Sequence, residues 1–213
     1  MADPITLEVF SDYVCPWCYL GDNRVKQLKD AYNVNIKLVH FPLHPETPSE
    51  GRTLANMFGV GDDEIAAKNQ RMQGLMKEEG LPFKDRSHTF NSRLAQEVGK
   101  WAETQDGGEA IHDKFFEAYF VDQRNIGDVD VILDVVKSAG LDMDEARKVI
   151  EDRTFKDAVD EDWAKSHQYG VTGVPTFVAA GPDGQLHGLV GAQPLEGLKQ
   201  LMDAVGATKK SSG

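Results

Sequence analysis

The sequence predicts an α/β protein in which a long helical insertion divides one mixed β-sheet. Three observations support this fold class. Residues 1–44 read as strand, helix and strand; residues 45–164 show helical periodicity without a convincing strand; and residues 165–213 return to strands followed by a helix. We therefore expect a sheet domain made of residues 1–44 and 165–213, and an inserted helical domain made of residues 45–164.

The first elements are a strand, a helix and a second strand. Ile5–Phe10 alternates apolar and polar residues and predicts a strand. Pro16–Tyr32 carries apolar residues at helical spacing, and Asn35–Leu43 predicts the second strand, with Pro42 closing it. Because a helix links the two strands, we expect them to pair in parallel with a right-handed crossover.

The middle of the chain repeats helical signals. Each predicted helix shows apolar residues three or four positions apart, and two of them stop at a glycine, Gly80 or Gly140. The predicted segments are Asp62–Glu79, Asn91–Thr104, Glu109–Val121, Asp128–Ala139, Asp144–Ile150 and a helix opening at Thr154.

The end of the chain predicts a β-hairpin and a last helix. Thr176–Ala180 and Leu186–Val190 read as strands, and the residues between them form a strong Gly-Pro-Asp-Gly turn signal. The last helix starts at Pro194 and ends at Gly206.

Composition and charge exclude several classes of function. The 213 residues include 35 acidic and 23 basic side chains, for a net charge of −12. Nucleic acids and anionic membranes attract basic surfaces, so neither is an expected partner. No stretch approaches the roughly 20 apolar residues of a membrane span, and the start of the sequence lacks a signal peptide's basic region. We expect a cytoplasmic protein, although a mature exported chain would look the same.

Both cysteines of the chain lie in one motif, Cys15-Pro16-Trp17-Cys18. The motif opens a predicted helix, where unpaired backbone N–H groups favour a thiolate and lower the pKa of the first cysteine. Pro16 suits a first helical turn. We expect Cys15, nearer the helix end and more exposed, to be the nucleophile, and Cys18 to resolve a mixed disulfide. Asp12 or Glu8 could accept a proton from Cys18 through water, although simple structural roles suit both acids.

A second stretch, Gly170 to Thr176, contains a proline at the start of a predicted strand. A cis Val174–Pro175 bond there would turn the chain sharply and leave the backbone polar groups of Val174 free for an extended peptide. The sequence does not decide the isomer.

These pieces together resemble the DsbA-like oxidoreductases of the thioredoxin fold. The resemblance rests on S-D-Y-V-C-P-W-C-Y-L-G, F-P-L-H-P-E, F-F-E-A-Y-F, G-V-T-G-V-P-T-F and G-A-Q-P, which occur in this order over nearly the full length. The cytoplasmic, polyketide-biosynthesis-type dithiol–disulfide isomerases (the FrnE-like branch) are the most similar group. The resemblance implies a thioredoxin fold with a large helical insertion, in which the proline loop faces the cysteine pair and the insertion covers the site.

The implied activity is thiol–disulfide exchange with a redox-active Cys15–Cys18 disulfide and no bound cofactor or metal. Val174, Pro175, Pro16 and Trp17 would contact the substrate, a protein or small molecule with a thiol or disulfide, and glutathione is a possible co-substrate. Asn91 lies in a stretch that resembles a ligand-contact segment of the family. The chain has Trp17 where strongly oxidising relatives carry histidine, so we expect weaker oxidising power. A homodimer is compatible with the sequence.

Two other functions stay open. The chain also resembles the kappa-like glutathione transferases and 2-hydroxychromene-2-carboxylate isomerases, which usually carry serine at the place of Cys15; both thiols of this chain favour the redox function. A zinc-binding interaction module would use Cys15, Cys18, His40 and His44, but the gap of 21 residues between the pairs exceeds the usual spacing of about 12–15. The simplest alternative is that both cysteines only fill core space.

Overall fold

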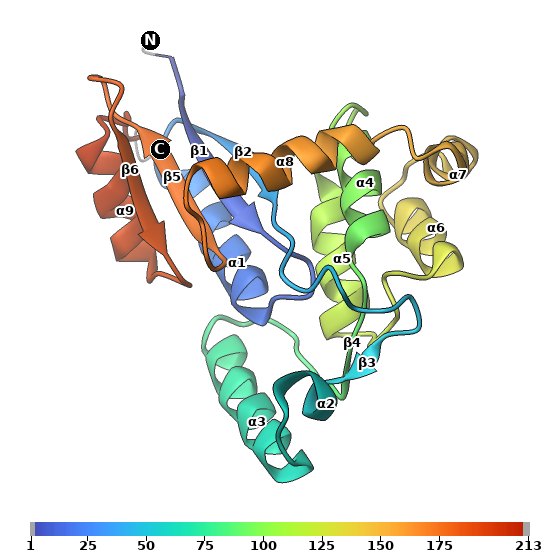
Figure 1. The fold of residues 1–213 in the computed structure, drawn as a ribbon. Helices are drawn as coiled ribbons and strands as arrows, with labels where there is room; N and C mark the ends of the chain where they lie inside the picture. The colour runs from blue at the N-terminus through green and yellow to red at the C-terminus, as the bar shows by residue number, and fades with distance from the viewer. Residues whose placement is uncertain (1–2, 211–213) are drawn as a thin grey trace. The chain divides into compact units, whose positions relative to one another are not determined.

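The protein consists of two compact units, here described by a computed structural model that covers residues 3–210 (Figure 1). One unit takes in the chain up to Phe41 and again from Trp163, and the other unit is Pro42–Asp162. The first unit holds the cysteine motif and is called the sheet unit below; the second is called the helical unit.

The sheet unit contains a four-stranded mixed sheet. Its strands are β1 (Ile5–Ser11), β2 (Val34–His40), β5 (Thr176–Ala180) and β6 (Leu186–Val190), in the order β2-β1-β5-β6. β1 pairs in parallel with β2, whereas the β1–β5 and β5–β6 pairs are antiparallel. The predicted parallel pair and the predicted hairpin are therefore confirmed.

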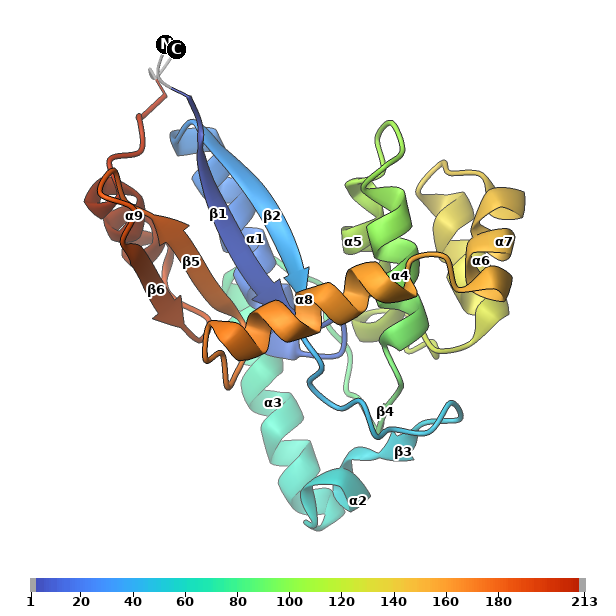
Figure 2. The same cartoon turned by 45° about the horizontal axis from the view of Figure 1, so that its top comes forward.

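Two helices pack on one face of this sheet. They are α1 (Pro16–Ala31) and α9 (Leu195–Ala204), and both lie on the same side of the strands in two views (Figures 1 and 2). Successive side chains of a strand point to opposite faces of the sheet. The apolar side chains on the face toward α1 and α9 form one core with these two helices. Its buried residues are Leu7, Val9, Val25, Leu28, Tyr32, Val34, Phe177, Ala179, Leu198, Leu201, Met202 and Val205.

A smaller apolar cluster lies on the other face of the sheet. Phe10, Val39 and Val178 form its buried part, and Val171 and Val174 pack against them. Val174 is thus anchored by apolar contacts on one side while its backbone borders the cysteine motif. This placement ties the proline loop to the centre of the sheet.

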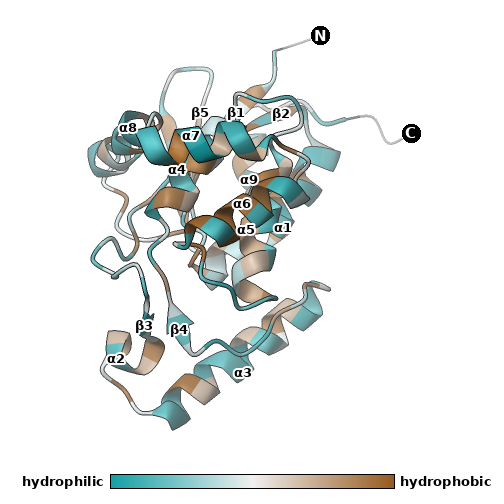
Figure 3. Ribbon diagram, turned by 90° about the vertical axis from the view of Figure 1, so that its right-hand side faces the viewer, coloured by the Kyte–Doolittle hydropathy of each residue, from teal (hydrophilic) through white to brown (hydrophobic). Residues whose placement is uncertain are grey.

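The helical unit is built mainly from amphipathic helices, whose hydrophobic and hydrophilic residues alternate along the ribbon (Figure 3). The helices α4 to α7 pack against one another. The helices that lie in this unit are α2 (Leu54–Phe58), α3 (Asp62–Glu78), α4 (Arg93–Ala102), α5 (Ala110–Phe120), α6 (Val129–Ser138) and α7 (Met143–Asp152). The next helix, α8 (Lys156–Gln168), begins in this unit and ends in the sheet unit.

The secondary structure departs from the prediction in two short strands, one helix that was not expected and one strand end. The helical unit contains two short strands, β3 (Arg52–Thr53) and β4 (His88–Thr89), which pair antiparallel. Two residues are too few to show an alternating pattern, so their pairing depends on the tertiary fold. Helix α2 was not predicted, and β2 ends at His40 rather than at Leu43.

A buried carboxylate holds several elements of the helical unit together. The side chain of Glu97 is 1% exposed and accepts hydrogen bonds from Arg93 (2.6 Å) and from both Nε and Nη2 of Arg153 (2.7 and 2.6 Å). Arg93 also donates to the carbonyl of Lys156. Burial alone would raise the pKa of Glu97, but the hydrogen bonds from the two arginines outweigh it, so the pKa lies below its ordinary value.

Candidate active site

The cysteine motif forms the start of α1. Cys15 is the N-cap residue and Pro16 occupies the first turn, as predicted. The backbone N–H of Cys15 donates to the carbonyl of Asp12 (3.1 Å), and the N–H of Cys18 donates to the carbonyl of Cys15 (3.0 Å). Both cysteines are free thiols here, one helical turn apart.

The two thiols do not differ in exposure. Cys15 is 3% exposed and Cys18 is 2% exposed, so the prediction that Cys15 would be the more exposed cysteine is wrong. All of the motif lies close to the core of the sheet unit, because it connects β1 to α1 and both elements contain buried residues. Any difference in reactivity between the cysteines must therefore come from their electrostatic surroundings.

Those surroundings separate the two thiols. The pKa of Cys15 is lowered, chiefly because the Cys18 side chain hydrogen-bonds to its sulfur; backbone N–H groups of Cys18 and Trp17 contribute to the lowering, and burial opposes it. The pKa of Cys18 is raised well above its ordinary value, first by burial and then by its position beside Cys15. Cys15 therefore ionises more readily than Cys18, which keeps its proton to higher pH.

The last residue of β1 and the loop that follows it also contact the sulfur of Cys18. The side chain of Ser11 and the backbone of Asp12 hydrogen-bond to Cys18 and favour its thiolate, although burial outweighs them. The carboxylate of Asp12 is buried and accepts from the N–H of Val14 (3.2 Å). Its negative charge opposes a thiolate at Cys15. Asp12 therefore acts on the pair directly.

Glu8, the other acid considered from the sequence, is engaged elsewhere. Its carboxylate pairs with Lys165 and lies 3.7 Å from Lys37. These ion pairs join β1 to β2 and to the end of α8. Of the two acids, Asp12 is the one that influences the cysteine pair.

The proline loop meets the cysteine motif across a long stretch of sequence. The Val174–Pro175 peptide bond is cis. The Cys15 thiol donates to the carbonyl of Val174, with 3.6 Å between sulfur and oxygen. Thr176, which follows, donates from its hydroxyl to the carbonyl of Gly173 (2.7 Å) and closes the loop. The structure therefore brings Cys15, Val174 and Pro175 together in one place.

A glycine in α1 allows this close approach, and sequence reasoning missed it. A Cβ atom on Gly21 would lie 3.2 Å from Cγ of Pro175 and 3.3 Å from Cζ of Phe177. Such distances are tighter than ordinary van der Waals contact. A glycine inside a predicted helix is unfavourable and often has a packing reason, which was the available signal.

A third loop completes the surroundings. The N–H of Gly191, just after β6, donates to the carbonyl of Pro175 (2.7 Å). Arg24 of α1 donates through Nη1 to the carbonyls of Ala192 (3.0 Å) and Gln193 (2.9 Å). This arginine fixes the G-A-Q-P segment against the helix that carries the cysteines.

Asn91 belongs to the helical unit, where its side chain fixes a loop. Its amide nitrogen donates to the carbonyl of Thr47 (2.7 Å), and its amide oxygen accepts from the N–H of Arg93 (2.9 Å). These bonds join the loop at residue 47 to the start of α4. A role in ligand contact stays a prediction for this residue.

The zinc alternative finds no support in the geometry. Within residues 3–210, no three His, Cys, Asp or Glu side chains are grouped closely enough to hold a metal ion. His40 is fully buried and its ring contacts Tyr13 edge-on, with 5.4 Å between centroids. It is therefore part of the core of the sheet unit.

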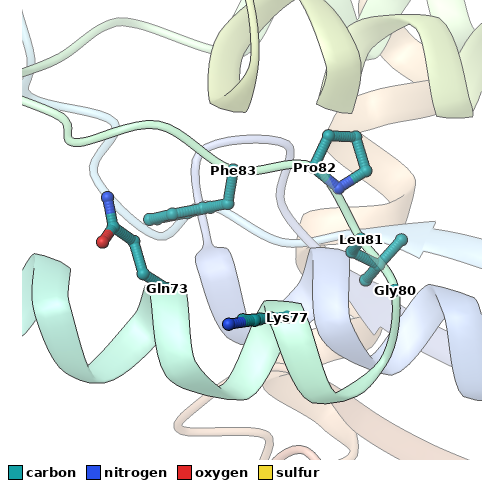
Figure 4. A pocket seen from close by; sticks show the side chains of 6 residues that line it. All are labelled: Gln73, Lys77, Gly80, Leu81, Pro82 and Phe83. Atoms are coloured by element: carbon teal, nitrogen blue, oxygen red, sulfur yellow. The ribbon is translucent and has the colours of Figure 1, made fainter.

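The helical unit contains a pocket of its own, of about 470 Å³, at the end of α3 (Figure 4). Figure 4 shows the ring of Phe83 and the side chains of Gln73 and Lys77 around it. Gln73 is already bonded to Asp85 (2.8 Å). We assign no function to this pocket.

Fold and site together define a class: proteins of the thioredoxin fold that carry a Cys-x-x-Cys dithiol at a helix start, facing a cis-proline loop. The sequence matches the DSBA-like thioredoxin domain over residues 6–203. The protein belongs to this family, and its α/β fold with a helical insertion is the fold of that family.

Individual relatives agree with this placement. A probable DsbA oxidoreductase of Streptomyces coelicolor is similar with a TM-score of 0.86 and 27% identity, over 98% of this chain and 93% of that one. The uncharacterized protein YwbO of Bacillus subtilis is 26% identical over 82% of this chain and 86% of its own length. The cytosolic disulfide reductase DsbM of Pseudomonas aeruginosa (TM-score 0.66, 20% identity, 93% and 98% coverage) shares the fold.

Every helix in the described residues 3–210 is too short or too polar to span a bilayer.

Proposed function

We propose that this protein is a thiol–disulfide oxidoreductase or isomerase that works through Cys15 and Cys18. One observation carries the proposal: the pKa of Cys15 is lowered and that of Cys18 is raised, while the Cys15 sulfur lies 3.6 Å from the Val174 carbonyl. A dithiol enzyme needs this asymmetry, because the attacking thiol must ionise more easily than the resolving thiol.

The reaction follows from this difference. The Cys15 thiolate attacks one sulfur of a substrate disulfide, a mixed disulfide forms, and the other substrate sulfur leaves as a thiolate that takes up a proton. Cys18 then loses its proton and attacks the Cys15 sulfur. The substrate leaves as a dithiol, and the protein holds a Cys15–Cys18 disulfide. The oxidised protein runs the same steps in reverse.

The substrate would bind as an extended segment along the proline loop. The carbonyl of Val174 is not free as expected, because it accepts from the Cys15 thiol. Once Cys15 ionises it can no longer donate, and this carbonyl would then accept from a substrate backbone N–H. Pro16, Trp17 and Pro175 are the side chains we expect to contact the substrate. The substrate is a protein or small molecule that contains a thiol or a disulfide.

Glutathione is a proposed co-substrate, and the setting is proposed to be the cytoplasm. Glutathione is bound in a structure of the DsbM reductase, which shares the fold at 19% identity. The motif places Trp17 between the cysteines rather than histidine, so we expect a less oxidising protein than DsbA-like relatives with histidine there. Membership of the FrnE-like branch rests on the quoted sequence motifs.

A glutathione redox titration followed by protein fluorescence tests the proposal. A reversible two-electron transition is expected; a midpoint between about −120 and −200 mV would indicate an oxidant or isomerase, and one near about −270 mV a reductase. Trp17→Phe identifies which part of the signal reports on the site. Cys15→Ser should abolish turnover, whereas Cys18→Ser should accumulate a mixed disulfide that mass spectrometry detects.

The same variants distinguish the proposed dithiol mechanism from a rival function, that of a glutathione-dependent isomerase or transferase. A 2-hydroxychromene-2-carboxylate isomerase shares the fold (TM-score 0.72, 17% identity, 93% and 94% coverage). In a glutathione-dependent isomerase or transferase, Cys18→Ser would keep its activity. A protein that binds glutathione without a reversible redox transition would contradict the dithiol mechanism.

A further inference from the structure

The hydrogen bond that the Val174 carbonyl accepts depends on the redox state of the cysteines. In the reduced protein the Cys15 thiol donates to this carbonyl, with 3.6 Å between sulfur and oxygen. A Cys15–Cys18 disulfide has no S–H group, so the oxidised protein lacks this hydrogen bond. A thiol is also a weak donor, and a backbone N–H is a stronger partner for the same oxygen.

The neighbours of Val174 hold its carbonyl in place. The hydroxyl of Thr176 donates to the carbonyl of Gly173 (2.7 Å), and the N–H of Gly191 donates to the carbonyl of Pro175 (2.7 Å). Neither of these donors changes when the cysteines are oxidised. The Val174 side chain also packs against the buried apolar cluster on its face of the sheet. The loop is fixed on both sides of Val174, so its carbonyl keeps its position when it loses the thiol.

We propose that the Cys15 thiol and an extended polypeptide compete for the Val174 carbonyl, so that the oxidised protein binds polypeptide more tightly than the reduced protein. The inference rests on the proposed thiol–disulfide exchange and names the substrate class that the site prefers. That substrate is an extended polypeptide with free cysteine thiols, bound to the oxidised protein. Its backbone N–H donates to the carbonyl that the thiol has left.

The direction from which each donor approaches explains the competition. A carbonyl oxygen has two lone pairs, and the thiol approaches the Val174 oxygen from the side of the Cys15 sulfur. A substrate cysteine that exchanges with Cys15 must bring its own sulfur, and the backbone beside it, to that side. The substrate N–H and the thiol S–H therefore meet at the same part of the oxygen.

The exchange reaction couples this competition to product release. A substrate thiolate attacks the Cys15 sulfur of the disulfide, and Cys18 leaves as a thiolate and takes up a proton. The second substrate thiol then loses its proton and attacks the first substrate sulfur, and Cys15 leaves as a thiolate. Two electrons have passed to the protein, and the substrate carries the disulfide. When Cys15 takes up a proton, its thiol returns to the Val174 carbonyl and displaces the product.

The binding of a peptide that cannot react tests the proposal. The probe is a short unstructured peptide with serine in place of its cysteine, and calorimetry measures its affinity. The pH is kept below the onset of Cys15 thiolate absorbance, so that reduced Cys15 carries its proton. The oxidised protein should bind the peptide on the order of 5-fold more tightly than the reduced protein, as expected for one ordinary hydrogen bond.

Two variants distinguish loss of the donor from formation of the disulfide. Cys15→Ala has neither a thiol nor a disulfide at this position, so it should bind the peptide as tightly as the oxidised protein. Cys18→Ala keeps the Cys15 thiol and cannot form the disulfide, so it should bind as weakly as the reduced protein. Each variant removes one sulfur, and circular dichroism of both should match wild type, which separates altered binding from lost folding.

The redox midpoint gives a reciprocal test. A ligand that binds the oxidised form more tightly stabilises that form. At saturation, about 5-fold tighter binding should lower the midpoint by about 20 mV, because a tenfold ratio corresponds to about 30 mV for a two-electron couple. A midpoint that the peptide leaves unchanged would contradict the proposal.

The carbonyl itself can be observed by NMR. Val174–Pro175 is the only Val-Pro step in the sequence, so valine labelled with ¹³C at its carbonyl and proline labelled with ¹⁵N mark this single peptide bond. The carbonyl carbon should shift upfield on oxidation, when the thiol donor is lost. It should shift back downfield when the peptide binds to the oxidised protein.

Several results would overturn the proposal. They are equal affinities of the oxidised and reduced proteins, a Cys15→Ala protein that binds as weakly as Cys18→Ala, and a carbonyl signal that does not respond to oxidation. Each of these results leaves the proposed function intact if the glutathione titration is reversible. A titration without a reversible transition would instead overturn both the exchange chemistry and the inference that rests on it.

Discussion

Replacing Cys18 tests the physical origin of the lowered pKa of Cys15. The largest contribution to that lowering is the hydrogen bond from the Cys18 side chain, ahead of the backbone N–H groups. Cys18→Ala removes the donor and leaves the helix start and the burial of Cys15 in place. The pKa of Cys15 should therefore rise.

The rise corresponds to the loss of one hydrogen bond to a charged group. Such a bond contributes about 1.5–3 kcal/mol. A thiol is a weak donor, so the low end of this range applies. Cys18→Ser keeps a donor at the same position, and its pKa should rise less than that of Cys18→Ala.

The ultraviolet absorbance of the thiolate, followed against pH, measures this directly and requires no reagent to reach a buried sulfur. In the wild-type protein Cys15 titrates first, because the pKa of Cys18 is raised well above its ordinary value. Cys15→Ser supplies the baseline. An unchanged or lower pKa in Cys18→Ala, or a larger rise in Cys18→Ser, would refute the assignment of the hydrogen bond as the main cause.

Three further predictions follow from single contacts. Gly21→Val should push Pro175 away from α1 and slow disulfide exchange, measured by steady-state kinetics; wild-type rates would contradict the packing role of Gly21. Asp12→Asn should lower the pKa of Cys15, because it removes a negative charge that opposes the thiolate, and a rise in the same absorbance titration would count against it. Glu97→Gln should reduce the free energy of unfolding in urea by about 3 kcal/mol, because it breaks a buried ion pair. Since the pKa of Glu97 is lower in the folded protein, its contribution is complete above the ordinary value and is lost as pH falls through the lowered value; a variant with the same acid sensitivity as wild type would refute this.

The sequence alone was enough for features that depend on local pattern. The hairpin strands Thr176–Ala180 and Leu186–Val190 have the predicted bounds, because alternation and the turn between them are local properties. The start of α1 at Pro16 was predicted for the same reason. The Cys-x-x-Cys spacing indicated dithiol chemistry because the two thiols must lie one turn apart.

Features made by distant segments could not be predicted in this way. The two-residue strands β3 and β4 exist only because the fold brings them together. The nearly equal burial of Cys15 and Cys18 also contradicts what position in a helix suggests, since burial depends on everything packed around the motif.

The sequence by itself therefore determined the family, the order of the main elements and the cysteine pair that we propose as the reactive one. Only the tertiary structure decided what sets those thiols apart. It placed the carbonyl of Val174 against the sulfur of Cys15, 159 positions away in the chain, and it used Gly21 to admit Pro175. A pKa responds to hydrogen bonds, charge and burial within a few ångströms, and the chain has these neighbours only after it has folded.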